Sequence, residues 1–237
     1  MKPPVIILAG GFGTRLKSKL PNLPKALAPV EGKPFLKYML LNLARQGVER
    51  VIISTGYLGQ LINEFIDSFN NEKLFKNQIL TVQEKTPLGT GGAVLNVLKK
   101  INIHENFIVV NGDTWLDNFY LELISSPSPA LGIIKINDSS RYGKVLLNIA
   151  ETHINLFSEK TNDSSGAWIS SGAIHLSAHH FNNVSEEKFS IEEELLPKII
   201  EMNKLKAVKL DCNFIDIGIP SDYYFFKENF HTKFYHD

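Results

Sequence analysis

The sequence predicts an α/β fold built on a mixed, mainly parallel β-sheet, and three observations support this. Short, continuously apolar runs alternate with amphipathic stretches over the first half of the chain, as in βα units joined by right-handed crossovers. The first run, residues 5–9, stops at Gly10 and Gly11, as a buried parallel strand does. After residues 125–129, short apolar runs follow one another with little helix between them, which predicts antiparallel or mixed pairing added to the same sheet.

The elements expected in the first half follow from this pattern in order. Residues 34–46 carry apolar side chains at helical spacing, and Gly47 ends the helix as a C-cap. The other expected elements are strands at 5–9, 50–54, 78–83 and 107–110, and helices at 58–65 and 93–98. A glycine-rich loop is expected at 89–92, between the third strand and its helix.

The second half is expected to be richer in strands. These are predicted at 131–136, 144–147, 154–157, 167–176, 206–210 and 214–217. Ser190 begins a helix whose first turns carry three glutamates, where carboxylates favour the helix dipole, and Pro197 kinks or offsets that helix. Pro220 opens a final helix, and the aromatic-rich tail 231–237 is expected to fray on the surface.

Composition excludes several function classes. Lys plus Arg and Asp plus Glu each total 25, so the formal net charge is zero, which argues against a general nucleic-acid binder or a binder of anionic membranes. No stretch reaches the ~18 apolar residues of a membrane span, and the N-terminus lacks the features of a signal peptide. The single Cys212 suits a reducing compartment, so we expect a cytoplasmic protein.

The strongest local signal is the loop LAGGFGTRL at residues 8–16, directly after the first strand. Ligands of open α/β sheets bind at the carboxyl ends of strands, glycines let backbone N–H groups approach phosphate oxygens, and Arg15 can contact those oxygens with its planar fork. Leu16 stands where a dinucleotide fingerprint needs its third glycine, and the Gly-Lys-Ser/Thr of a P-loop is missing. The alternative is a tight strand-exit turn, but Thr14, Arg15 and Lys25 favour phosphate binding.

Lys25 follows in the proline-framed segment PKALAP at residues 24–29. Prolines restrict the backbone on both sides, so the ammonium can be directed at a phosphate at a lower entropic cost. Taken alone, Lys25 would be read as a solvated surface group.

Together, the loop and Pro24-Lys25 resemble the signature of sugar-1-phosphate nucleotidyltransferases, which join a sugar 1-phosphate to a nucleoside triphosphate and release pyrophosphate. The likeness covers nearly the whole chain in the expected order. It continues through EKTPLGTGG at 84–92, NGDT at 111–114, RYG at 141–143, FSEK at 157–160, FSIE at 189–192 and DIGIP at 216–220. Within that family the chain looks most like the D-glycero-D-manno-heptose 1-phosphate guanylyltransferases, and next most like the mannose-1-phosphate guanylyltransferases.

The resemblance implies a Rossmann-like three-layer sandwich of the nucleotide-diphospho-sugar transferase type. It implies one domain over 1–237, with a nucleotide-binding half at about 1–125 and a sugar-phosphate-binding half at about 126–237. The implied reaction transfers GMP from GTP to a heptose 1-phosphate, giving a precursor of lipopolysaccharide or capsule, with a homodimer possible. Mannose 1-phosphate as acceptor and a uridylyl- or thymidylyltransferase remain open. So does a function of another class, a non-catalytic nucleotide-sugar sensor.

The resemblance also implies the nucleotide-binding residues. They are Leu8, Ala9, Gly10, Gly11, Gly13, Thr14, Arg15, Lys25, Glu84, Gly89, Thr90 and Gly112. Glu84 follows the third strand, in the region that holds the nucleobase in this family. A carboxylate can accept two hydrogen bonds from the N1 and N2 donors of guanine, whereas thymine and uracil offer one N–H flanked by acceptors. Glu84 therefore favours guanine, the alternative being a simple surface charge after a strand.

Two aspartates are candidates for binding Mg²⁺. Asp113 follows a buried strand at the carboxyl edge of the sheet, a position suited to a hard oxygen ligand. The alternative is an Asn-Gly hairpin turn, which we disfavour because residues 115–119 look irregular. Asp216 lies among apolar strand residues, where a carboxylate is costly unless it is paired or metal-bound. It could pair with a buried Lys or Arg, but the resemblance implies a second metal ligand.

The acceptor side rests on the resemblance alone. The implied sugar-phosphate-binding residues are Tyr142, Gly143, Glu159, Lys160, Gly172 and Glu192. Lys160 would orient the nucleophile and complete a catalytic set with Arg15, Lys25 and Asp113. The chain departs from the family pattern at Ser170, where an Asn is usual, and at Lys144.

Overall fold

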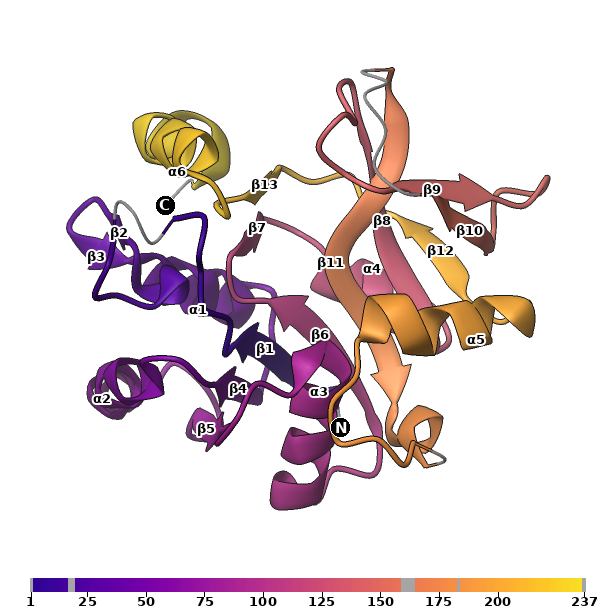
Figure 1. Ribbon diagram of the computed structural model, residues 1–237. Coiled ribbons are helices and arrows are strands. Elements are labelled where there is room, and N and C mark those ends of the chain that lie inside the picture. Colours follow the sequence, from indigo (N-terminus) through magenta and orange to yellow (C-terminus); the bar gives the residue numbers. More distant parts are fainter. Residues whose placement is uncertain (1, 17–19, 159–164, 183, 236–237) are drawn as a thin grey trace.

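A nine-stranded sheet forms the centre of the computed structural model, and helices cover both of its faces (Figure 1). The structure describes residues 2–16, 20–158, 165–182 and 184–235. The main path of the sheet runs in the order β10-β9-β11-β6-β1-β4-β5, and β8 pairs with both β11 and β12.

The first half of the chain supplies four strands that run parallel to one another. Its strands are β1 (Val5–Ala9), β4 (Val51–Thr55), β5 (Leu80–Gln83) and β6 (Asn106–Asn111). The second half adds β8 (Ala130–Ile136), β9 (Lys144–Leu147), β10 (Ile154–Ser158), β11 (Ala167–Ser177) and β12 (Lys206–Lys209). Strand β11 runs antiparallel to β6 and joins the two halves. The predicted mixed, mainly parallel sheet is thereby confirmed.

Two further strand pairs lie outside this sheet. β7 (Thr114–Leu116) pairs antiparallel with β13 (Phe214–Asp216), and β2 (Pro29–Val30) pairs with β3 (Lys33–Pro34). The pairing of β7 with β13 matters for the site, because it brings the segment after β6 to the late part of the chain.

The face on which each helix lies depends on the direction in which the chain steps across the sheet. The steps from β1 through β4 to β5 move one way across the sheet, and the step from β5 to β6 moves back, so right-handed crossovers place α3 on the opposite face. One face carries α1 (Phe35–Arg45), α2 (Gly59–Phe69), α4 (Tyr120–Ser125) and α6 (Pro220–Glu228). The other carries α3 (Gly89–Ile101) and α5 (Leu196–Glu201), which a π-helical turn at Ile191–Leu195 precedes. The result is the expected three-layer sandwich.

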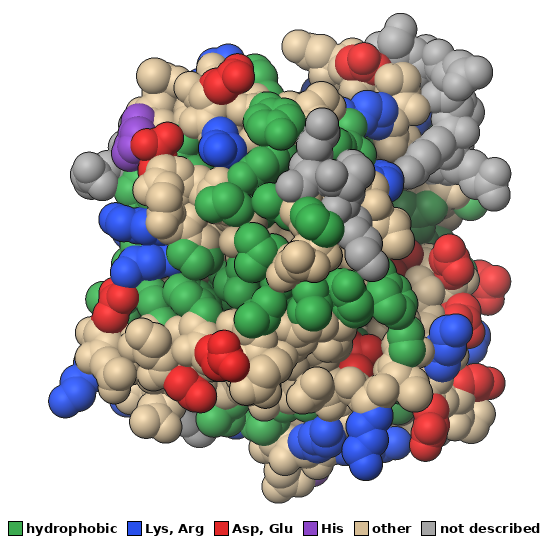
Figure 2. Space-filling view, turned by 60° about the vertical axis from the view of Figure 1, so that its left-hand side comes forward, with side chains coloured by type: hydrophobic (Ala, Val, Ile, Leu, Met, Phe, Trp, Pro, Cys, Tyr) green, Lys and Arg blue, Asp and Glu red, His purple; other side chains and the backbone are tan. Residues whose placement is uncertain are grey.

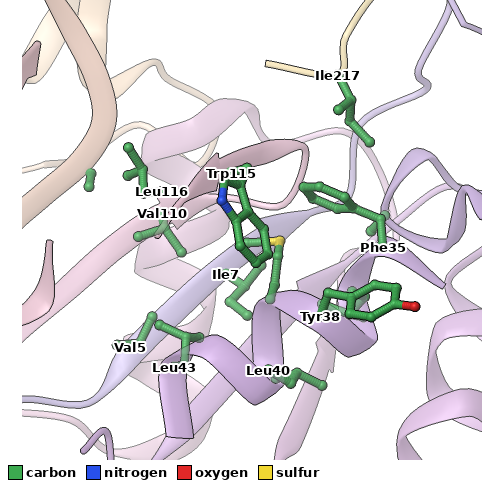
Figure 3. Close-up of a cluster of buried hydrophobic side chains, with 14 of the residues drawn as sticks. Val5, Ile7, Phe35, Tyr38, Leu40, Leu43, Val110, Trp115, Leu116 and Ile217 are labelled. Atoms are coloured by element: carbon green, nitrogen blue, oxygen red, sulfur yellow. The ribbon is translucent and has the colours of Figure 1, made fainter. Parts of the chain in front are cut away.

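Successive side chains of each central strand point to opposite faces of the sheet, so each strand contributes to both hydrophobic cores. In β1, Val5 and Ile7 point to the core beneath α1, whereas Ile6 points to the core beneath α3. Trp115 is fully buried in the first of these cores, near Phe35 and Val110 (Figure 3). Each core excludes water from one side of the sheet, so the carboxyl ends of the strands are held rigidly.

Three sequence-based expectations about local structure are wrong. The stretch at residues 89–92 is not a loop but the first turn of α3, which starts at Gly89. Residues 115 and 116, expected to be irregular, belong to β7, because β13 supplies a partner that lies far away in the sequence. In the described part of the tail, residues 231–235, Phe234 is buried against Phe226 of α6, so this part does not fray.

The surface mixes charge types. Figure 2 shows hydrophobic side chains gathered in a band across the middle of one face, with Lys, Arg, Asp and Glu side chains interspersed mainly around it. Within the described ranges, the structure contains no helix that is both long and apolar enough to cross a bilayer.

Candidate active site

The site lies where the strand order reverses. Strand β1 has β4 on one side and β6 on the other, so the segments that leave β1 and β6 diverge and open a crevice at the carboxyl edge of the sheet. A cavity of about 370 Å³ occupies this crevice. Its walls are Leu8, Ala9, Gly10, Gly11, Phe12, Gly13, Lys25, Ala26, Glu84, Pro87, Leu88, Gly89, Thr90, Ala93, Asn111, Gly112 and Asp113.

The cavity brings together most residues that the sequence predicts for nucleotide binding. Of the twelve, all line the cavity except Thr14 and Arg15, which are exposed on the segment after the glycine loop. Asp113, predicted for catalysis and metal binding, lines it as well. Among the wall residues that the sequence did not indicate are Leu88 and Asn111. The backbone N–H of Leu88 holds Glu84, a contact that leaves no mark on the sequence, whereas Asn111 stands in the NGDT motif and could have been recognised there.

Glu84 is held in a fixed orientation at the end of β5. Its Oε1 accepts a hydrogen bond from the hydroxyl of Ser54 at 3.2 Å, and its Oε2 accepts one from the backbone N–H of Leu88 at 3.1 Å. Burial raises the pKa of the Glu84 carboxyl, while these two hydrogen bonds oppose the increase. Each oxygen keeps a further lone pair, so the carboxylate can still accept two donors from a ligand in the cavity.

The wall that follows Glu84 is fixed by a segment from the second half of the chain. The carbonyl of Phe189 accepts hydrogen bonds from the backbone N–H groups of Gly91 at 3.0 Å and Gly92 at 3.3 Å, and the N–H of Phe189 donates to Leu88 at 3.0 Å. A Cβ atom at Gly91 would overlap the ring of Phe189. Glycine is therefore required there by the close approach of the two segments.

Two residues of the predicted site meet in an ion pair. The Lys25 Nζ lies 2.6 Å from Asp113 Oδ2, and the side chains are only 15% and 27% exposed. Lys25 begins the short 3-10 helix Lys25–Leu27, and Asp113 follows β6 after one intervening glycine. The pair crosses the end of the cavity that the glycine loop borders.

Asp216 lies beside Asp113 because β13 pairs with β7. The backbone N–H of Ile217 donates to the carbonyl of Asp113 at 2.9 Å, and Asp216 is paired with Thr114. Burial and the charge of Asp113 raise the pKa of the Asp216 carboxyl, against the opposing effect of the Gly218 N–H, Lys25 and Arg15. Two carboxylates that repel each other in this way are a fitting pair of ligands for a divalent cation.

A cation at this pair would need further ligands. In the part of the chain that the structure describes, no group of three or more His, Cys, Asp or Glu side chains is arranged to hold a metal ion. Mg²⁺ is commonly held by one or two carboxylates together with substrate phosphates. The donor set of Asp113 and Asp216 fits that pattern.

The described members of the predicted sugar-phosphate set, Tyr142, Gly143, Gly172 and Glu192, do not line this cavity. Glu192 Oε2 accepts from the hydroxyl of Thr90 at 2.6 Å, so it contacts the nucleotide side of the site. Gly172 has a φ of +74°, and a Cβ atom there would lie 2.7 Å from Asn111 Nδ2. Tyr142 is partly buried beside Phe214, with ring centroids 5.8 Å apart, and Gly143 follows it. Glu159 and Lys160 lie outside the described residues.

The two departures from the family pattern have local partners. The Ser170 hydroxyl accepts from the N–H of Gly172 at 3.2 Å, so the shorter side chain turns back on its own strand. Lys144 Nζ lies 3.3 Å from the hydroxyl of Ser165.

Comparison with known proteins agrees with this geometry. Residues 4–233 match the nucleotidyl transferase family. The chain is 37% identical to the D-glycero-alpha-D-manno-heptose 1-phosphate guanylyltransferase of Campylobacter jejuni, over 94% of this chain and 98% of the relative. It is 36% identical to the protein of the same name from Aneurinibacillus thermoaerophilus, over 92% and 94%. Crystal structures of HddC from Yersinia pseudotuberculosis, one of them complexed with GMP-PN, superpose with a TM-score of 0.83 at 38% identity, over 96% of this chain and 99% of HddC.

Proposed function

The chain belongs to the nucleotidyl transferase family, and on that premise we propose that it transfers GMP from GTP to D-glycero-D-manno-heptose 1-phosphate and releases pyrophosphate. The observation that carries this proposal is the partly buried, oriented carboxylate of Glu84 in the wall of the cavity. The names of the two bacterial relatives and the GMP-PN complex of HddC support the same nucleotide and acceptor. The reaction belongs in the cytoplasm, where GTP is made.

The reaction is a displacement at the α-phosphorus of GTP. An oxygen of the sugar phosphate forms a bond to this phosphorus, the bond to the bridging oxygen of the β-phosphate breaks, and pyrophosphate leaves. The sugar phosphate is already an anion near neutral pH, so no general base is required. Positioning and neutralisation of charge account for most of the rate enhancement in transfers of this kind.

The chain provides groups for both tasks. Gly10, Gly11 and Gly13 of the glycine loop line the cavity, so their backbone N–H groups can bind phosphate oxygens there. Lys25 and Arg15 balance the charge of the triphosphate, and Lys160 orients the sugar phosphate. The carboxylate of Glu84 accepts hydrogen bonds from guanine N1 and N2, which places the α-phosphorus by fixing the other end of the nucleotide.

Asp113 and Asp216 would hold Mg²⁺ at the reacting phosphate. When bound, the ion neutralises the charge that develops on the phosphate oxygens. The two carboxylates are held by separate strands, β13 and the end of β6, so their spacing depends on the β7–β13 pairing rather than on a flexible loop.

The test is pyrophosphate release with Mg²⁺ for GTP, UTP, dTTP, CTP and ATP, each with heptose, mannose, glucose and N-acetylated sugar 1-phosphates. We expect release with GTP and heptose 1-phosphate. A preference for mannose 1-phosphate would keep the guanine assignment and change the acceptor. A preference for UTP or dTTP would show that Glu84 does not select guanine. Loss of release with every pair would favour the nucleotide-sugar sensor.

A further inference from the structure

The loop that contains the predicted acceptor residues Tyr142 and Gly143 is tied to the last helix by an ion pair. Arg141 Nη1 donates to Asp222 Oδ1 at 2.8 Å, and Arg141 Nη2 donates to the second oxygen of the same carboxylate. The two bonds run side by side, in the forked geometry that gives Arg–carboxylate pairs their directionality. The Asp222 side chain is 15% exposed and that of Arg141 is 43% exposed, so the pair lies at the edge of the protein interior.

Asp222 is a rigid anchor for this contact. It lies in the first turn of α6, where a carboxylate is favoured by the helix dipole. The next residue, Tyr223, donates from its hydroxyl to the carbonyl of Pro29 at 2.6 Å, and Phe226 is fully buried in the aromatic core. The position of Asp222 is therefore set by the packing of α6 on the body of the protein.

Two ring contacts place Tyr142 against the strand that holds Asp216. The Tyr142 ring meets that of Phe214 edge to face at 5.8 Å, and the Arg141 guanidinium lies 5.6 Å from the centroid of the Tyr142 ring. Phe214 and Asp216 belong to the same three-residue strand, β13. The acceptor loop is therefore docked on the segment between Phe214 and Asp222, with Asp216 inside it.

Electrostatics indicates the same proximity. Burial raises the pKa of the Tyr142 hydroxyl, the charge of Arg141 lowers it, and those of Asp222 and Asp216 raise it. The charge of Arg15, which lies on the segment after the glycine loop, also lowers the pKa of this hydroxyl. Tyr142, on the acceptor loop, thus lies close to Asp216, which is assigned to the metal.

We propose that Arg141 is a positioning residue for the sugar 1-phosphate, whose ion pair with Asp222 holds Tyr142 and Gly143 next to Asp216. This inference rests on the proposed function, because it assigns the acceptor to that loop. A lysine at position 141 would keep the positive charge but lack the forked guanidinium, so it would hold the loop that contains Tyr142 and Gly143 less firmly. In the alternative role, Arg141 would release Asp222 and bind the phosphate of the sugar 1-phosphate directly.

The first test is kinetic. Arg141→Gln and Asp222→Asn should each raise the KM for the sugar 1-phosphate by about tenfold and leave the KM for GTP unchanged, and the double variant should be no worse than either single one. Arg141→Lys should fall between wild type and Arg141→Gln. The charge-swapped variant Arg141→Asp with Asp222→Arg should recover part of the loss. If Arg141→Gln raises the KM while Asp222→Asn does not, Arg141 contacts the acceptor directly and the proposal is wrong.

The second test does not depend on activity. Asp222→Asn should speed cleavage by trypsin after Arg141, followed by mass spectrometry, because the loop is released from α6. An unchanged rate of cleavage would overturn the proposed anchoring, even if the wild-type enzyme showed no turnover and the proposed function had failed. Thermal unfolding shows whether each variant is folded.

The matched control is the ion pair of Lys209 with Glu151, which is also partly exposed and lies away from the cavity. Lys209→Gln should change neither the KM for the sugar 1-phosphate nor the cleavage after Arg141. An equal effect of Lys209→Gln on either measurement would show that the changes reflect a general loss of surface ion pairs.

Discussion

The ammonium of Lys25 lies 2.6 Å from the carboxylate of Asp113, although 88 positions separate the two residues in the sequence. Asp216 borders the same pair, and Lys25 and Arg15 both lower the pKa of the Asp216 carboxyl. Lys25 and Asp113 line the cavity, and Asp216 and Arg15 add one charge of each sign close to this pair. The cluster therefore carries two negative and two positive side chains.

Asp113→Asn should abolish metal-dependent turnover and leave the fold intact. The amide keeps the shape of the side chain but removes one of the two negative charges that would hold Mg²⁺, and we expect kcat to fall by about 10²-fold or more. Pyrophosphate release across a Mg²⁺ titration measures this, with circular dichroism as the test of folding. Asp67→Asn, an exposed position on α2, is the control. Unchanged turnover in Asp113→Asn would contradict the metal assignment.

Asp216→Asn should be inactive but more stable than the wild type at neutral pH. The raised pKa means that the folded state holds this proton more tightly than the unfolded chain does, so the stability of the wild type falls as pH rises from the ordinary aspartate pKa of 3.8 through the folded value. The neutral amide removes this penalty, and we expect a gain of about 1 kcal/mol. Urea unfolding without Mg²⁺ measures it. The gain should vanish below pH 3.8, and a variant less stable at neutral pH would contradict the argument.

Glu84 should make GTP binding dependent on pH. Only the ionised carboxylate accepts both guanine donors, and burial raises its pKa above the ordinary value of 4.5. The KM for GTP should therefore rise as pH falls through this raised pKa, earlier than for an exposed glutamate. Glu84→Gln should raise the KM for GTP about 10- to 100-fold, which corresponds to the free energy of hydrogen bonds to a charged group. The same variant should also lose this pH dependence. Because the phosphates of GTP titrate equally with both proteins, the difference between the two profiles isolates Glu84.

Gly91→Ala should damage the nucleotide side of the site through packing. The added methyl group would overlap the Phe189 ring and force α3 away from the segment that fixes its first turn. We expect a loss of about 1–3 kcal/mol in the free energy of unfolding and a higher KM for GTP. Adding Phe189→Leu should restore part of the KM, since it makes room for the methyl group. Equal effects of Gly91→Ala alone and in the double variant would rule out the clash as the cause.

Phe234→Ala should destabilise the whole protein by about 3–5 kcal/mol, because it leaves a hole in a buried aromatic cluster. Its ring lies 4.9 Å from that of Phe226, on α6. Phe225→Ala is the control. The Phe225 side chain is 44% exposed on α6, so its removal should lower the free energy of unfolding much less. Urea unfolding of the two variants gives the comparison, and equal losses would show that the tail does not pack as described.

The sequence was most informative where structure is local. The strand at 5–9 and the helix after Pro34 were predicted closely, because apolar periodicity and a glycine C-cap act over a few residues. The strand β7 was missed because its partner β13 is about a hundred residues away, and three residues carry no alternation of their own. The buried tail was missed for the same reason, since an exposed and a buried run of aromatics read alike in sequence.

The candidate site followed the same rule. The glycine loop, Glu84 and Asp113 could be predicted because each lies just after a strand whose carboxyl end borders the cavity, whereas Lys25 could be predicted from its proline-framed segment and the family resemblance. Ser54, which orients Glu84, was not predicted, because nothing in a strand sequence marks which hydroxyl will meet a carboxylate from the next strand. The pairing of Arg141 with Asp222 was missed because it depends on where α6 packs.

The contact between β6 and β11 limits how this enzyme type can diversify. Ala173–Ser177 of β11 pairs with residues 106–110 of β6, and the Phe189 backbone fixes the first turn of α3. A foreign segment joined in place of the second half of the chain would have to reproduce both contacts before the first half could fold correctly. On the proposed assignment of Tyr142 and Gly143 to the acceptor, new acceptor specificity is therefore expected to arise by substitution within loops such as residues 139–143 rather than by exchange of whole halves.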